Sequence, residues 1–166
     1  MYDPNVLFTE EQQFRQPWIV ASIIVGDVIS VVVLWFALTG IAGVGRDQAV
    51  AGTAAFAAVA LLFGWLMLGS KMITEVRGGS VTVRSWPILM RRVIPIDQIT
   101  GCEARTYSPL REYGGWGIRF GRSGKAYNMI GNRGVQLEIA PTERLLIGSQ
   151  RADELASVIQ SRMRTG

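Results

Sequence analysis

The sequence predicts an α+β membrane protein: a transmembrane helical hairpin followed by a bent antiparallel β-sheet or barrel with a C-terminal amphipathic helix. Three observations predict this fold class. Two long apolar runs lie between residues 18 and 68. The chain after residue 71 alternates apolar and polar residues between glycine-containing turns, as half-buried strands do. Residues 151–164 then change to the period of a helix.

The first apolar run extends from Trp18 to Leu38 and contains one charged residue, Asp27. At about 1.5 Å per residue it would span roughly 31 Å, the thickness of a bilayer's hydrocarbon core. The second run, about residues 49–68, contains no charge. A signal peptide is not expected, because the first run is too long for an h-region and follows acidic residues. We expect an N-terminal segment (1–17), a transmembrane hairpin (18–70) and a C-terminal domain (71–166).

The distribution of basic residues predicts the orientation of the hairpin. The segment between the two runs contains Arg46 as its only positive charge, whereas the region after the second run begins with Lys71 and Arg77 and continues basic. Arg15, before the first run, adds weak support. By the positive-inside rule, both termini of this multi-pass protein are expected in the cytoplasm.

The C-terminal domain is expected to form about seven or eight strands. A hairpin at Gly78-Gly79 would join the first two, since this pair suits a tight turn. Further strands are expected at about 88–96, 102–107, 116–121, 135–140 and 144–149, with loops at 97–101 and 108–115. The best core candidates, by alternation, are Trp116, Ile118, Phe120, Val135, Leu137 and Ile139.

The glycine-rich stretch "GRSGKAYNMIGNRG" at residues 121–134 poses the question of a phosphate-binding loop. A P-loop would need glycine where Arg119 stands and a hydroxyl residue where Ala126 stands. The flanking sequences also alternate like strands, so no helix N-terminus is available for an anion. We interpret "RSGK" and "GNRG" as hairpin turns that bind no nucleotide.

The C-terminal helix is predicted from "RADELASVIQSRMR". Ser149 could cap its start, and Asp153 and Glu154 in the first turn complement the helix dipole. Its apolar stripe consists of Leu155, Val158, Ile159 and Met163.

Two membrane helices followed by "VRGGSVTVRSWPILMRRVIPIDQI", "YGGWGIRF", "AYNMIGNRGVQLEI" and "RLLIGSQRADELASVI" resemble bacterial membrane proteins that carry a pleckstrin-homology (PH)-like domain. The resemblance covers roughly residues 71–160. It implies a strongly bent sheet capped by a C-terminal helix, and a location in the bacterial cytoplasmic (inner) membrane. It also implies binding of proteins or lipid headgroups without catalysis, and fold analogy alone does not choose between these.

The residue types argue against an enzyme. The chain has no histidine and one cysteine, Cys102, which excludes the usual zinc sites and the Ser-His and Cys-His nucleophile pairs. Four carboxylates, at Glu103, Glu112, Glu138 and Glu143, form no motif. We therefore expect no catalytic residue, no metal, no cofactor and no small-molecule substrate.

Asp27 lies near the middle of the first apolar run, where an acid costs about 2.5–3.5 kcal/mol on insertion scales. Either it is neutral and satisfied within its own helix, or it contacts a polar group of another subunit. Small residues recur beside it at Ser22, Gly26 and Ser30, and on the second run at Ala51, Ala55 and Ala58. Such stripes allow close helix approach, inside the hairpin for one of them and against a partner for the other.

From residue 71 onward the chain has 15 lysines and arginines against 8 aspartates and glutamates. This excess could bind anionic lipid or merely orient the protein. Nucleic-acid binding is not expected, because no recognised motif accompanies the charge. The candidate basic interaction surface comprises Arg84, Arg91, Arg92, Arg119, Arg122, Lys125 and Arg133.

These features predict a non-enzymatic, membrane-anchored interaction protein. The leading hypothesis is an accessory or scaffold subunit that stabilises a larger integral-membrane complex through its helices and its PH-like domain, with other membrane subunits as partners. The alternative hypothesis is recognition of anionic lipid headgroups at the cytoplasmic membrane surface.

Overall fold

The structure is a computed structural model that describes residues 5–14, 17–40, 44–121 and 123–164. The chain divides into two compact units. One unit contains residues 14–70 and consists of a helical hairpin. The other combines the N-terminal residues up to Gln13 with residues 71–166.

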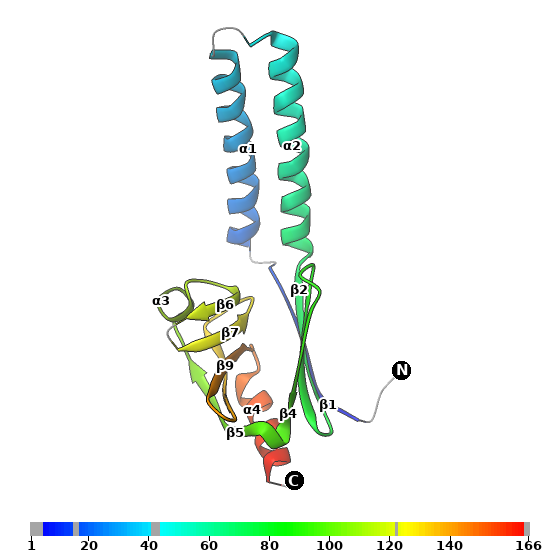
Figure 1. The fold of residues 1–166 in the computed structure, drawn as a ribbon, viewed down its shortest axis with the longest axis vertical. Coiled ribbons are helices and arrows are strands. Elements are labelled where there is room, and N and C mark those ends of the chain that lie inside the picture. Colours follow the sequence, from blue (N-terminus) through cyan, green and yellow to red (C-terminus); the bar gives the residue numbers. More distant parts are fainter. Residues whose placement is uncertain (1–4, 15–16, 41–43, 122, 165–166) are drawn as a thin grey trace. The chain divides into compact units, whose positions relative to one another are not determined.

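The hairpin consists of α1 (Pro17–Gly40) and α2 (Arg46–Gly69), which lie side by side in Figure 1. Both helices are long and apolar enough to cross a membrane, so the prediction of two apolar helices is confirmed. Gly45 caps α2, and its N–H donates to Oε1 of Gln48 at 3.3 Å. Arg15 lies outside the described residues, so the structure adds nothing on its part in orientation.

The first sheet of the other unit has four antiparallel strands in the order β1-β2-β3-β4. Gly78 and Gly79 form the turn between β2 and β3, as predicted. The sequence pattern predicts no strand in residues 1–17, but residues 6–13 pair along the whole of β2. The strands are β1 (Val6–Gln13), β2 (Lys71–Arg77), β3 (Ser80–Trp86) and β4 (Met90–Pro95).

The second sheet has five strands in the order β5-β8-β9-β7-β6. "RSGK" lies in the β6–β7 hairpin, where Gly121 pairs with Gly124, although Arg122 is outside the described residues. "GNRG" is not a hairpin turn, because β9 lies between β7 and β8 and pairs with β7 in parallel. The strands are β5 (Ile99–Thr106), β6 (Gly117–Gly121), β7 (Gly124–Asn128), β8 (Arg133–Ile139) and β9 (Glu143–Gly148).

Three short or terminal helices complete this unit. The 3₁₀ turn η1 (Ile96–Gln98) connects the two sheets. The predicted loop at 108–115 contains α3 (Pro109–Tyr113), which starts with a proline and ends at Gly114 in the left-handed conformation, φ 73°. The predicted C-terminal helix is confirmed as α4 (Ala152–Met163).

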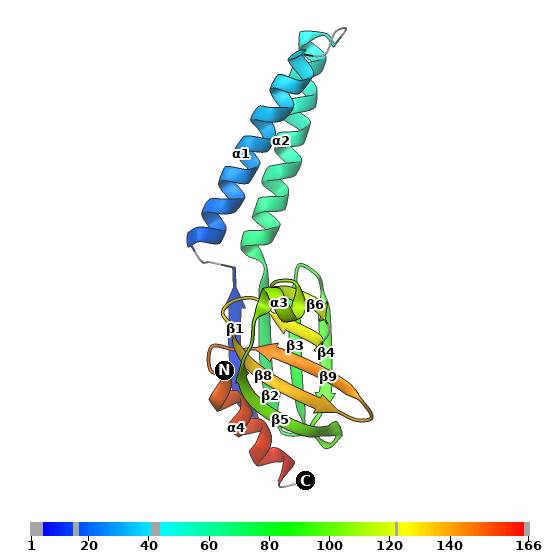
Figure 2. The same cartoon turned by 90° about the vertical axis from the view of Figure 1, so that its left-hand side faces the viewer.

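Helix α4 packs against β5 and β8, as Figure 2 shows, with Leu155 and Ile159 fully buried. Val158 and Met163 are half-buried. Ser149 is not the N-cap residue of α4 that the sequence predicts; the N-cap is Arg151. The Oγ of Ser149 instead accepts the N–H of Arg151 at 3.0 Å.

The predicted core is right for β8 and wrong for part of β6. Val135, Leu137 and Ile139 are buried, but Phe120 is 73% exposed and Trp116 and Ile118 are half-buried. The reason is that β6 is an edge strand that pairs only with β7. Alternation predicts which side chains share a face of a strand, but not whether that face is covered.

The expectation of one bent antiparallel sheet or barrel is replaced by two sheets, one antiparallel and one mixed. Figure 1 shows them as two layers, and the described strands form no closed barrel. The inner faces carry fully buried valine, leucine and isoleucine side chains from both sheets. The unit is therefore an α+β domain whose core lies between the two sheets and α4.

Candidate functional site

The hairpin contact places Asp27 beside a glycine. A Cβ added to Gly64 of α2 would lie 3.1 Å from Oδ2 of Asp27 and 3.4 Å from Cγ2 of Ile23. Gly64 and Ala60 are buried, so they form the close-approach face of α2. Asp27 therefore points towards its own hairpin partner, and it makes no hydrogen bond to any residue that the structure describes.

The two small-residue stripes lie on the other faces of the helices. Ser22, Gly26 and Ser30 are exposed on α1, and a Cβ added to Gly26 would meet nothing within 4 Å. Ser22 Oγ donates to the Trp18 carbonyl at 2.7 Å, and Ser30 Oγ to the Gly26 carbonyl at 2.8 Å. The stripe at Ala51, Ala55 and Ala58 is exposed too. Both stripes are thus free of the hairpin contact, so the expectation that one of them lies inside the hairpin is wrong.

The structure disperses the candidate basic surface. Arg92 of β4 and Lys125 of β7 both bind Glu143, at 2.6 and 2.9 Å, and so join the two sheets. Arg133 pairs with Asp153 of α4 at 2.9 Å. Arg119 Nε donates to the Trp116 carbonyl at 2.8 Å. Arg122 lies outside the described residues.

The link at Glu143 predicts acid sensitivity. The hydrogen bond from Lys125, followed by that from Arg92, lowers the pKa of Glu143 below its usual 4.5. A lowered pKa gives stability that is complete above pH 4.5 and is lost as the pH falls through the lowered value. We expect Glu143→Gln to reduce the fall in unfolding temperature between neutral pH and about pH 3. The exposed Glu103→Gln should leave it unchanged, and equal slopes for all three proteins would contradict the assignment.

Arg84 and Arg91 remain together on the outer face of the first sheet. They are direct cross-strand neighbours on β3 and β4, and both are exposed. Neither forms an ion pair with any other described residue, whereas Lys71 on the same face lies 3.7 Å from Glu11. Like charges directly opposite each other destabilise a sheet. An external anion would relieve this repulsion.

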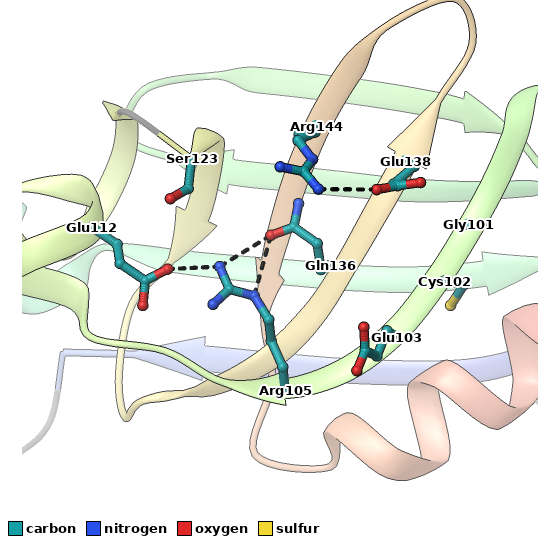
Figure 3. Close-up of a pocket in the computed structure, with 9 residues that line it drawn as sticks. All are labelled: Gly101, Cys102, Glu103, Arg105, Glu112, Ser123, Gln136, Glu138 and Arg144. Carbon is teal, nitrogen blue, oxygen red and sulfur yellow. Dashed lines mark hydrogen bonds and ion pairs between the residues drawn. The ribbon is translucent and has the colours of Figure 1, made fainter.

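A polar pocket of about 410 Å³ lies on the outer face of the second sheet, beside α3. Figure 3 shows Arg105 at its centre, between Glu112 and Gln136, with Arg144 and Glu138 forming a second pair. Arg105 donates to Glu112 at 2.8 Å, to the Tyr113 hydroxyl at 3.1 Å and to Gln136 at 3.2 Å. Both arginines of the pocket are therefore already neutralised by carboxylates.

The chemistry available in this pocket is hydrogen bonding. The bond from Arg105 lowers the pKa of Glu112, so this carboxylate is ionised at neutral pH. Burial raises the pKa of the Cys102 thiol to about 11, which leaves it protonated and weakly nucleophilic. Among the described residues no group of three or more potential metal ligands occurs. The charged groups of the pocket are thus largely satisfied by one another.

Sequence reasoning missed a buried network that joins β1 to the β9–α4 junction. The Glu10 carboxylate accepts the Ser149 hydroxyl, the Gln150 N–H at 2.8 Å and the Gln12 side chain at 2.9 Å. Gln12 also donates to the Gly148 carbonyl at 2.8 Å. The alternation of Phe8, Glu10 and Gln12 is a strand signal, but two of these three inward side chains are polar.

No protein-family model matches the chain, and no curated protein matches it either.

Proposed function

We propose that this protein is a non-enzymatic accessory or scaffold subunit of a larger integral-membrane assembly. In this proposal α1 and α2 cross a bacterial cytoplasmic membrane, both termini are cytoplasmic, and the two-sheet domain is a docking surface. The PH-like relationship belongs to the proposal too. Its support is the order of strands followed by an amphipathic C-terminal helix.

The observation that supports this proposal is that the small-residue stripes face away from the contact between α1 and α2. The hairpin uses Gly64 and Ala60 for its own contact and leaves Ser22, Gly26 and Ser30 exposed. In lipid, helices associate through small residues that allow backbones to approach closely. A stripe that the hairpin does not use therefore offers a contact for a further transmembrane helix.

Replacing Gly26 with leucine tests this proposal. The side chain should fit the hairpin, since an added Cβ meets nothing within 4 Å, but it would hold a partner helix away. We expect association in native membranes to weaken on the order of tenfold, about 1.4 kcal/mol. The measurement is quantitative co-purification with blue-native electrophoresis after mild detergent extraction.

Val25→Leu is the matched control, because Val25 is an adjacent exposed position that already carries a branched side chain. It should leave association unchanged. A wild-type protein that migrates only at monomer size, or a Gly26→Leu variant that retains every partner, would contradict the subunit role.

Recognition of anionic headgroups is the second candidate function. The pair Arg84 and Arg91 favours it, because these exposed cross-strand neighbours form no ion pair among the described residues. Near an anionic surface each arginine contributes about 1 kcal/mol of attraction. Such binding weakens as ionic strength rises.

A further inference from the structure

The turn between β3 and β4 exposes apolar side chains to solvent. Ile88 is 63% exposed and Leu89 is 85% exposed. Trp86 ends β3, Met90 begins β4, and both are half-buried. Exposed apolar side chains that adjoin one another on a single turn, unlike scattered single ones, can mark an interaction site.

The strand register places this turn at one particular end of the first sheet. Trp86 pairs with Lys71, the first residue of β2, and Lys71 pairs with Gln13, the last residue of β1. Only Ser70 separates β2 from the end of α2 at Gly69. Two residues of extended chain span at most about 7 Å. The β3–β4 turn therefore lies at the end of the first sheet where the chain enters from the apolar helix.

Charged side chains flank the apolar tip on the same sheet face. Arg84 is two residues before Trp86, and Arg91 follows Met90. Apolar side chains with a tryptophan and arginines around them suit the membrane interface, where rings lie at headgroup level and arginines reach the phosphates. Two more exposed apolar residues, Leu110 and Phe120, belong to α3 and β6. Both elements lie towards the same end of this domain in Figures 1 and 2.

We propose that the Trp86–Met90 turn inserts into the interfacial layer of the membrane that α1 and α2 cross, with Arg84 and Arg91 bound to lipid phosphates. The proposal rests on the membrane-spanning hairpin of the proposed function. The lipid surface is favoured over a partner protein because the tether keeps it at a high effective concentration. This third attachment would fix one face of the domain towards the bilayer.

The test uses the full chain in lipid nanodiscs, with Cys102→Ser as the background. Single cysteines at three positions carry an environment-sensitive fluorophore. Leu89→Cys reports on the turn, and Gly78→Cys reports on the β2–β3 turn at the opposite end of the same strands. Val59→Cys, on an exposed face of α2, reports on the helices. Quenchers in the acyl chains and in water measure the location of each label.

We expect labels at positions 59 and 89 to be quenched by lipid and protected from the aqueous quencher, and the label at position 78 to show the reverse. Adding Ile88→Asp should move the label at position 89 into water without altering thermal unfolding, because Ile88 is already exposed. Replacing Arg84 and Arg91 with glutamine should weaken insertion into anionic lipid about fivefold per arginine, and weaken insertion into neutral lipid by less.

The outcomes separate the two proposals. A label at position 59 in water would overturn the membrane hairpin itself. A label at position 59 in lipid with position 89 in water would overturn the insertion alone. Protection of position 89 in native membranes but not in lipid-only nanodiscs would assign the turn to a partner protein and also overturn insertion.

Discussion

Replacing Glu10 with alanine is expected to lower the free energy of unfolding of the two-sheet domain by about 2–4 kcal/mol. Glu10 is 9% exposed, and its carboxylate is the acceptor for the Ser149 hydroxyl and the Gln150 N–H. Without it these donors lose their partner inside the protein. The loss should be largest for β1, because this network connects that strand to the β9–α4 junction.

Glu11→Ala is the matched control, since Glu11 is the next residue on the same strand. Its side chain is 43% exposed and lies 3.7 Å from Lys71, so its removal should change stability by less than about 1 kcal/mol. Urea unfolding of the full chain, with amide hydrogen exchange of β1, β2 and β9, measures both effects. Equal protection of β1 in the Glu10 and Glu11 variants would show that the network does not hold the strand.

The strand that this network holds adjoins an apolar helix in the sequence. β1 ends at Gln13, four residues before α1 begins, and β2 begins at Lys71, two residues after α2 ends. Gln13 and Lys71 are themselves paired, so the ends of β1 and β2 that adjoin the apolar helices in the sequence lie together in one sheet.

Much of the fold could be predicted because its signals are local. An apolar run of 21 residues predicts a long apolar helix whatever surrounds it. The β2–β3 hairpin follows from two glycines between alternating runs, and α4 follows from a helical stripe with acidic residues in its first turn. These signals depend on neighbours within a few positions along the chain.

The rest depended on contacts between distant segments. The inward face of β1 is largely polar, so its sequence is typical of a surface segment. It is buried because Glu10 binds Ser149 and Gln150, which lie about 140 positions later in the chain. The parallel pairing of β7 with β9 cannot be predicted from the sequence either, since the sequence between these strands is typical of a simple antiparallel meander. A local pattern does not specify which strand occupies the neighbouring position in a sheet.

The candidate site was predictable by residue type but not by grouping. Charge alone groups the seven basic residues, yet Arg92 and Lys125 both neutralise Glu143 between the sheets. Only the strand register shows that Arg84 and Arg91 are neighbours without a counter-ion among the described residues. Likewise the sequence indicates the small residues of α1, but only the structure shows which face of α1 meets α2. Gly64 lies beside Asp27, so the small residues lie on another face.

Gly124→Ala is expected to lower the free energy of unfolding by about 3 kcal/mol or more, the second large effect. Gly124 begins β7 at φ 105°, a conformation that residues with a side chain rarely adopt. An added Cβ would also lie 2.4 Å from the Arg144 carbonyl oxygen and 2.8 Å from Arg144 Cβ. The strain and the overlap act together, and a backbone atom cannot move aside as a flexible side chain can.

Two other glycines separate the contributions to this effect. Gly131→Ala tests backbone conformation alone, since Gly131 has φ 74° and an added Cβ meets nothing within 4 Å, so the expected loss is about 1–2 kcal/mol. Gly78→Ala has neither problem and should be neutral or stabilising by up to about 1 kcal/mol. In thermal and urea unfolding of the full-length variants, Gly124→Ala should therefore be the least stable, Gly131→Ala intermediate and Gly78→Ala the most stable. If Gly124→Ala were as stable as Gly78→Ala, this result would contradict the close approach of β7 to β9 at Gly124. The glycine of "RSGK" would then need a role other than the steric one that the neighbouring strand β9 gives it.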